Sequence, residues 1–204
     1  MKRDVKRRTT KVVTSGSKTS GSVRIISGQF RGRKLPVLDV QGLRPTTDKN
    51  KEMLFNWLMP YTQGASCLDV FAGSGGLGFE ALSRYADNCI FIELDKQAAK
   101  KLAENIQLLG LTVEQALLMQ GSAQNILTSL SQRFDLIFLD PPFNQNLLPS
   151  IVQLITDNSL LALKGVIYIE CEGQGSDYTV PDNWQLIKQK QHPQILSRLY
   201  QRVR

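Results

Sequence analysis

The stretch CLDVFAGSGGLGFEA, residues 67–81, decides the fold class of this chain. It joins an apolar run to a turn in which Gly73, Gly75 and Gly78 have the spacing G-x-G-x-x-G. In doubly wound α/β folds such a turn follows the first strand and opens the next helix. The glycines do not by themselves distinguish a dinucleotide, which needs room for a pyrophosphate, from a ligand without phosphates.

Downstream of this turn, nearly continuous apolar runs alternate with segments of helical spacing, as in a parallel sheet covered by helices on both faces. The predicted strands are residues 66–71, 89–94, 115–120, 134–139 and 165–171. The predicted helices between them are residues 77–85, 96–109, 123–132 and 147–158. WQLIKQK and ILSRLYQRV then flank an HPQ turn, which predicts an antiparallel hairpin at the end of the sheet.

The bulk composition is that of an ordinary globular protein. The 204 residues suffice for one α/β domain with a modest extension, and 42% of them are hydrophobic and 21% charged. Neither a signal peptide nor an apolar run of the ~20 residues needed to cross a membrane is present, so we expect a cytoplasmic protein. Cys67, Cys89 and Cys171 lie in or beside apolar runs and are expected to be buried thiols. The single histidine, His192, excludes a His-rich metal site, and we expect no metal.

Positive charge is concentrated at the N-terminus. Residues 1–51 hold 14 Lys/Arg against 3 Asp/Glu, whereas residues 52–204 hold 11 against 15. A basic lobe of this kind favours a polyanionic partner. Residues 1–22 have the composition of a disordered leader, which either solubilises the chain or binds that partner.

After the leader, RIISGQFRGRKLPV, residues 24–37, is predicted to form a small β-hairpin. It mixes one aromatic with polar and basic side chains, as RNA-binding surfaces do, although a solvated hairpin is the alternative. LRPTT, residues 43–47, leads into a predicted helix at residues 48–59, capped by Thr47 or Asp48. We therefore divide the chain into a leader (1–22), an RNA-binding hairpin and helix (23–60) and an α/β domain (61–204).

Two acidic residues end the first two predicted strands. Glu93 lies where an acidic residue hydrogen-bonds the ribose hydroxyls of either class of nucleotide ligand. Asp69 lies beside the glycine turn, where a carboxylate would repel a pyrophosphate but would suit an amino group. S-adenosylmethionine has a ribose, an adenine, an ammonium group and no phosphate, so it fits better than NAD. Glu80, in the following helix, is expected to be a solvated charge.

The sequence Asp140-Pro141-Pro142-Phe143 follows the apolar strand FDLIFL. Two prolines cannot continue a central strand, so the chain must leave the sheet here. The turn would place backbone carbonyls beside a carboxylate, and two converging acceptors suit an exocyclic NH₂ group. Phe143 would offer a flat face to an extruded base. The alternative is a turn that only ends the strand.

DVFAGSGG, the Glu93-Leu94-Asp95 triplet and DPPF together resemble the S-adenosylmethionine-dependent amino-methyltransferases of nucleic acids. RIISGQFRGRKLPV, LRPTTDKNKEMLFNWL and RLYQR are similar to the RsmD-type methyltransferases, which methylate a guanine N2 of 16S ribosomal RNA in the bacterial small subunit. The resemblance covers residues 24–203. It implies a Rossmann-like class I methyltransferase fold, S-adenosyl-L-methionine as cofactor, and a monomer acting on the small subunit or its assembly intermediate.

The resemblance also implies three groups of site residues. The expected cofactor site, in which Ser122 or the backbone of Ala123 replaces a commonly acidic adenine contact, comprises Asp69, Phe71, Ala72, Gly73, Ser74, Gly75, Glu93, Leu94, Ser122 and Ala123. The expected catalytic residues are Asp140, Pro141, Pro142 and Phe143. The expected RNA contacts are Gln29, Phe30, Arg31, Arg33, Lys34, Arg44 and Thr46.

Three other functions remain open at this point. A DNA adenine or cytosine amino-methyltransferase would share both motifs, but the chain has no target-recognition insertion beyond its small N-terminal lobe. An NAD-dependent oxidoreductase would satisfy the glycines and leave DPPF without a role. A non-catalytic ribosome-assembly protein would need only the basic lobe.

Overall fold

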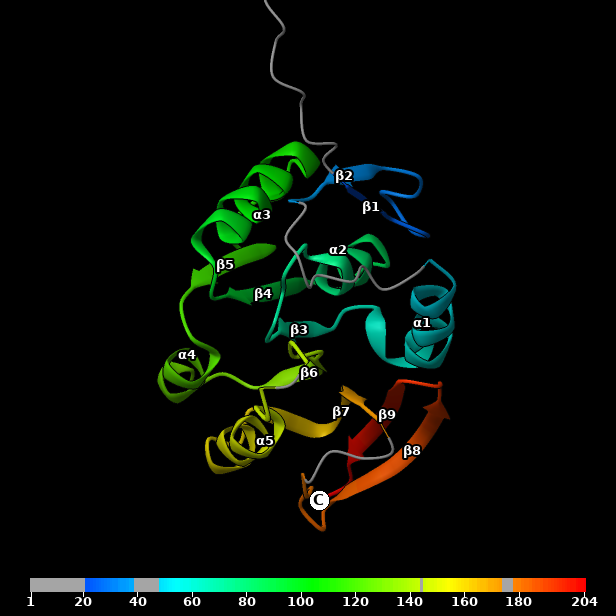
Figure 1. Cartoon of the computed structure of the whole chain (residues 1–204), viewed down its shortest axis with the longest axis vertical. Helices are drawn as coiled ribbons and strands as arrows, with labels where there is room; N and C mark the ends of the chain where they lie inside the picture. The colour runs from blue at the N-terminus through cyan, green and yellow to red at the C-terminus, as the bar shows by residue number, and fades with distance from the viewer. Residues whose placement is uncertain (1–20, 39–47, 144, 174–177) are drawn as a thin grey trace, which may run out of the picture.

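A computed structural model describes residues 21–38, 48–143, 145–173 and 178–204 of the chain (Figure 1). Its main sheet has seven strands in the order β5-β4-β3-β6-β7-β9-β8. The strands are β3 (Ser66–Asp69), β4 (Asn88–Glu93), β5 (Ala116–Gln120), β6 (Phe134–Leu139), β7 (Leu161–Glu172), β8 (Trp184–Gln191) and β9 (Ile195–Arg202). The first five strands in the spatial order are parallel to one another, and β9 is antiparallel to both of its neighbours, β7 and β8. The predicted α/β class, the mostly parallel sheet and the C-terminal hairpin are thus confirmed.

The helices cover both faces of the sheet (Figure 1). One face carries α1 (Asp48–Thr62), α2 (Gly76–Ser83) and α3 (Lys96–Leu109), and the other carries α4 (Ala123–Ser129) and α5 (Leu148–Asp157). The predicted elements agree with the observed ones within a few residues. The main differences are that α1 continues past Pro60, α4 ends three residues early, and β7 begins four residues before its predicted start.

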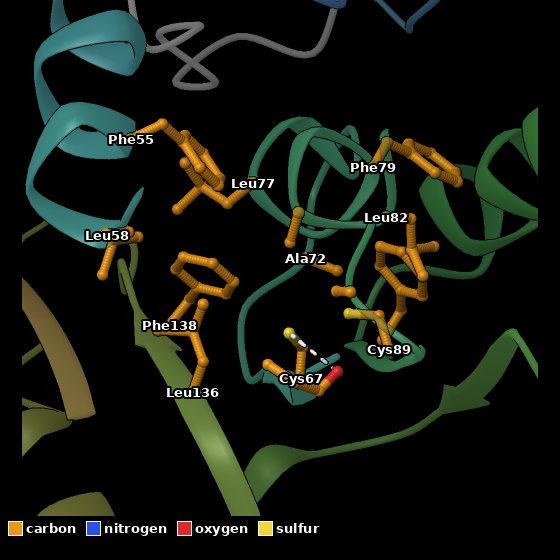
Figure 2. Close-up of a cluster of buried hydrophobic side chains, with 14 of the residues drawn as sticks. Phe55, Leu58, Cys67, Ala72, Leu77, Phe79, Leu82, Cys89, Leu136 and Phe138 are labelled. Carbon is orange, nitrogen blue, oxygen red and sulfur yellow. Dashed lines mark hydrogen bonds between the residues drawn. The ribbon is translucent and has the colours of Figure 1, made fainter. Parts of the chain in front are cut away.

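Two hydrophobic clusters, one on each face of the sheet, form the core. In the first, Phe55 of α1 meets Phe138 of β6 with ring centroids 6.0 Å apart, and Phe79 of α2 meets Phe91 of β4 at 4.9 Å. Figure 2 shows the side chains of α1 and α2 meeting over the strands. The three cysteines are free and buried, as expected. No helix of the described residues is both long and apolar enough to span a bilayer.

The N-terminal hairpin pairs β1 (Ser22–Arg24) with β2 (Lys34–Pro36). The hairpin begins two residues before the predicted range 24–37, and residues 25–33 between its strands form a loop that follows the surface of α2. The end of α2 accepts two hydrogen bonds from this loop: Ser83 O from Gln29 N at 2.8 Å and Leu82 O from Gln29 Nε2 at 3.0 Å. A helix end leaves carbonyls without intrahelical partners, and the loop satisfies them. The hairpin is therefore docked on the helix that follows the glycine turn.

Candidate active site at the carboxyl edge of the sheet

The glycine turn and the DPPF turn leave the sheet from neighbouring strands. β3 pairs with β6 in parallel, with Asp69 opposite Phe138, and Val70 N donates to Phe138 O at 3.2 Å. The chain winds from β3 through β4 to β5 on one side and returns to β6 on the other. This reversal is the point at which doubly wound sheets bind their ligands. The two motifs singled out from the sequence are thus brought together.

The glycine turn has a tightly folded backbone. Ala72 N donates to Ile92 O at 2.9 Å, and Gly75 N donates to Ala72 O at 2.7 Å. Gly73 and Gly75 have φ of 51° and 77°, a region that glycine enters without steric cost. At Gly75 a Cβ atom would also lie 2.4 Å from the Phe79 ring. Both the conformation and the packing therefore require glycine at this position.

Glu93 closes β4 beside this turn. Its Oε2 accepts a hydrogen bond from Gly73 N at 2.7 Å, and its Oε1 accepts one from Asp95 N at 2.8 Å. The side chain is partly exposed, and each carboxylate oxygen keeps a second lone pair for another donor. Glu93 is thus oriented by the loop and can still accept hydrogen bonds from hydroxyl groups. Leu94, next in the chain, is 67% exposed, as an apolar surface for a flat ring would be.

Asp69 lies deeper than the sequence suggested. It is only 2% exposed, and its Oδ2 accepts a hydrogen bond from Gly78 N at 3.1 Å, which holds the first turn of α2. Burial raises the pKa of Asp69 to about 7, a rise that the Gly78 hydrogen bond opposes and the charge of Glu93 reinforces. This carboxyl group can therefore be charged or neutral near pH 7, depending on what binds beside it.

Ser122 and Ala123 begin α4, at the end of the neighbouring strand β5. The Ser122 hydroxyl accepts a hydrogen bond from Asn125 N at 3.3 Å and caps the helix. Gly121 N donates to Glu93 O at 2.9 Å, so this helix start lies next to Glu93. Since the first N–H groups of a helix have no intrahelical acceptor, the backbone of Ala123 offers a donor here.

The four residues of the DPPF turn differ in their exposure to solvent. Asp140 is partly exposed and Pro141 is buried, whereas Pro142 and Phe143 are exposed, Phe143 to 40%. Burial of the Asp140 carboxyl group raises its pKa well above the usual value, and the charges of Glu170 and Asp69 raise it further. Perturbed acids of this kind concentrate at functional sites. Phe143 presents a largely open ring.

A buried polar cluster behind Asp140 was not predicted. Glu170 of β7 is 8% exposed, Tyr168 2% and Ser197 of β9 2%. The Tyr168 hydroxyl donates to Glu170 Oε2 at 2.5 Å and lies 3.1 Å from Ser197 Oγ. The sequence does carry a signal for this cluster, because a glutamate at the end of the apolar run GVIYIE needs a partner once it is buried.

The predicted RNA-binding residues differ in their surroundings. Gln29 bonds the end of α2, Phe30 packs against the core, and Arg33 donates to Leu108 O at 3.0 Å. Arg31 and Lys34 are exposed. Arg44, Thr46 and the other residues of the 43–47 stretch lie outside the described residues, as do residues 1–20 of the leader.

The expectation that Glu80 is a solvated charge is wrong. Glu80 is fully buried and accepts hydrogen bonds from Ile26 N at 2.8 Å and Ser27 N at 3.0 Å. Two cations compensate its charge: Arg84 Nε at 2.8 Å and Lys51 Nζ at 3.7 Å. One carboxylate therefore connects α2, α1 and the N-terminal loop. Helical position alone does not reveal this burial, because it depends on the docking of residues far away in the sequence.

Comparison with known proteins agrees with this arrangement. The family described as "Conserved hypothetical protein 95" matches residues 23–201. The chain belongs to this family. Within it, the chain is 48% identical over 193 residues to the ribosomal RNA small subunit methyltransferase D of Haemophilus influenzae, covering 94% of this chain and 98% of that protein. It is 47% identical to the Escherichia coli K12 protein of the same name, covering 90% and 91%. The predicted RsmD-type family is thus confirmed.

Solved structures of family members have the same fold. A putative methyltransferase from Escherichia coli superposes with a TM-score of 0.82 at 44% identity, covering 90% of this chain and 99% of that one. A putative methylase from Haemophilus influenzae superposes with a TM-score of 0.79 at 46% identity, covering 90% and 100%. These likenesses confirm the predicted Rossmann-like methyltransferase fold.

Proposed function

We propose that this protein transfers a methyl group from S-adenosyl-L-methionine to the exocyclic N2 of a specific guanine in 16S ribosomal RNA. The substrate is the small ribosomal subunit or an assembly intermediate, and the protein acts as a monomer in the cytoplasm. The names of the relatives support the RNA and the reaction type. The observation that carries the proposal is the adjacency of the glycine turn and the DPPF turn on β3 and β6.

The donor groups of the first turn fit S-adenosyl-L-methionine better than a dinucleotide. Glu93 would accept hydrogen bonds from the two ribose hydroxyls, since its carboxylate is oriented by the loop and each oxygen retains a free lone pair. Leu94 and the start of α4 would contact the adenine, and the backbone from Asp69 to Gly75 would hold the methionine part. A charged Asp69 beside the turn would repel a pyrophosphate. When bound, this cofactor supplies an electrophilic methyl group on a sulfonium.

Asp140 and Pro141 would hold the target amine. The lone pair of a guanine N2 is conjugated with the ring, so the nitrogen is a weak nucleophile until its hydrogens are held out of the ring plane. The Asp140 carboxylate and the Pro141 carbonyl are the two acceptors for those hydrogens. Positioned acceptors contribute through orientation and electrostatics. After transfer the guanine N2 is positively charged. Asp140 then accepts one of the two protons that N2 carried before the reaction, which leaves a neutral methylated amine.

The exposed groups around this centre would hold the RNA. Phe143 offers a ring face to the flipped guanine, and such stacking contributes about 1–3 kcal/mol per base in other nucleic-acid complexes. Arg31 and Lys34 would contact phosphates, since both are exposed; Arg33 is exposed as well, but it already donates to Leu108 O.

The test is radiolabelled methyl transfer to small subunits from cells that lack the protein, followed by mass-spectrometric mapping of the modified base. We expect one methylated guanine N2 with wild-type protein and a loss of at least roughly 100-fold with Asp140→Ala. S-adenosylhomocysteine affinity, measured by calorimetry, should remain within about twofold. Asp157→Asn, an exposed carboxylate on α5, is the matched control and should be as active as wild type.

Several results would contradict the proposal. Tight NADH binding without S-adenosylhomocysteine binding would indicate an oxidoreductase. Transfer to duplex DNA rather than to ribosomal RNA would indicate a DNA methyltransferase. Binding of the subunit without any transfer would indicate an assembly factor.

A further inference from the structure

Glu170 lies beside Asp140 in the sheet. Leu139 of β6 is paired with Ile169 of β7 in a parallel register, so the next residues, Asp140 and Glu170, lie abreast. Neighbouring strands are ~4.8 Å apart, and side chains alternate between the two faces. Because Phe138 and Tyr168 share one face, Asp140 and Glu170 are directed to that same face.

The contacts of Glu170 fix its side chain. Its Oε2 accepts the 2.5 Å hydrogen bond from Tyr168, whose hydroxyl is in turn 3.1 Å from Ser197 Oγ. Two strands therefore supply this support, β7 and β9. A carboxyl group that is 8% exposed and anchored through Oε2 has Oε1 left for a second partner.

Within the described ranges, no lysine or arginine forms an ion pair with Asp140 or Glu170. Burial raises the pKa of Glu170, although the Tyr168 hydrogen bond and the charge of His192, in the β8–β9 turn, lower it. Asp140 faces Glu170 on one side and Asp69 on the other, and both charges raise its pKa beyond the effect of burial. Two neighbouring carboxyl groups with little access to water cannot both ionise easily.

We propose that Glu170 is a positioning residue for the methyl-transfer site, and that its carboxyl group and that of Asp140 hold one proton between them in a hydrogen bond. This inference rests on the proposed function. The shared hydrogen bond uses one oxygen of Asp140 and fixes its rotamer, so the other oxygen is directed at the amine. The pair titrates as a unit, with the second ionisation delayed by the first.

Glu170→Gln separates the charge from the geometry. Glutamine can accept from Tyr168 through Oε1 and donate to Asp140 through Nε2, so the orientation is kept while the negative charge is lost. Glutamine cannot ionise, so the second ionisation of the pair is lost. We therefore expect the basic limb of the kcat profile for rRNA methylation, where the wild-type pair loses its shared proton, to be absent from this variant. Glu172→Gln, two residues farther along β7, is the matched control and should leave the limb in place.

Glu170→Ala removes both hydrogen bonds. We expect kcat to fall by roughly tenfold or more, with KM for the subunit and S-adenosylhomocysteine affinity little changed. The glutamine variant should restore most of that loss. If alanine and glutamine are equally impaired and the glutamine variant keeps the basic limb, Glu170 has only a structural role and the inference fails.

A second measurement does not depend on activity. The Asp140 carboxyl carbon, labelled with ¹³C and assigned through Asp140→Asn, can be titrated by NMR without RNA. We expect a midpoint above that of an ordinary aspartate in wild type and a lower midpoint in Glu170→Gln. An unchanged midpoint would overturn the shared proton. If wild-type protein transferred no methyl group while the midpoint still moved, the proposed function would fail and the carboxyl pair would stand.

Discussion

The buried carboxylate of Glu80 accepts a hydrogen bond from Ile26 N at 2.8 Å and so ties α2 to the loop between β1 and β2. Lys51 of α1 joins the same group, donating to Arg24 O at 2.5 Å while lying 3.7 Å from Glu80. Since α2 begins at the glycine turn, the N-terminal hairpin is attached to the element that would hold the cofactor.

The first prediction concerns this buried charge. Glu80→Gln leaves Lys51, which is 2% exposed, without its anionic partner. Burial lowers the pKa of Lys51, and the charge of Glu80 opposes that effect in the wild type. Breaking a buried pair on one side typically costs about 3–5 kcal/mol. We expect a loss of that order in the free energy of unfolding from urea denaturation. Glu104→Gln, which breaks an exposed pair with Lys101, is the control and should have no measurable effect.

The second prediction compares two glycines of the N-terminal loop. Gly28 and Gly32 have almost the same φ, 83° and 84°, but a Cβ atom at Gly28 would lie 1.7 Å from Ser83 O, whereas at Gly32 nothing lies within 4 Å. Gly32→Ala should cost about 1–2 kcal/mol, the conformational penalty alone. Gly28→Ala should cost distinctly more and weaken rRNA binding by displacing the hairpin. Equal losses of stability in the two variants would mean that the close approach to α2 is not maintained in solution.

The third prediction tests the exposed cations. Replacing Arg31 and Lys34 with alanine should weaken binding to the small subunit and reduce the slope of log affinity against log salt by roughly 1 to 2. Thermal stability should be unchanged, because neither side chain is buried. Alanine at Arg133 and Lys164, exposed cations near the amino ends of β6 and β7, is the control. A similar loss of affinity in both double variants would argue against the hairpin as a specific contact.

The fourth prediction follows from the raised pKa of Asp69, which burial moves from 3.8 to about 7. An acid whose pKa is raised by folding stabilises the fold while both states are protonated, and that contribution is lost as pH rises between the two values. Asp69→Asn keeps an acceptor for Gly78 N and removes the titration. Its free energy of unfolding relative to wild type should rise by roughly 3–4 kcal/mol from about pH 4 to about pH 7 and then level off. Denaturant titrations without cofactor across that range measure this, and a difference independent of pH would show that Asp69 keeps its ordinary pKa.

The alternation of apolar runs and the two turn motifs were enough to predict the sheet, its helices and its antiparallel end. Short stretches of sequence determine these features, since a strand such as FDLIFL or a turn such as DPPF is recognisable without the segments around it. The placement of both turns at the carboxyl edge of the sheet also followed from the sequence, whereas the pairing of β3 with β6 is known only from the structure.

The buried acids were harder to predict from the sequence. Glu80 looks like a surface residue of α2 until the loop at residues 25–30 covers it, and Glu170 is coupled to Asp140 only through the register of β6 and β7. Gln29 likewise has an amide suited to a base, and the structure uses it at the end of α2. Each of these roles depends on a contact between segments distant in the chain, which residue type and spacing do not encode.

The position of β9 has a consequence for how the protein is made. Although β9 follows every other strand in the chain, it lies between β7 and β8 and supplies Ser197 beside Tyr168. During synthesis, β8 therefore leaves the ribosome with no partner to pair with, and β7 keeps one open edge until Ile195–Arg202 emerges. A nascent chain stalled before that point would expose one edge of β7 and both edges of β8, the kind of surface that invites aggregation.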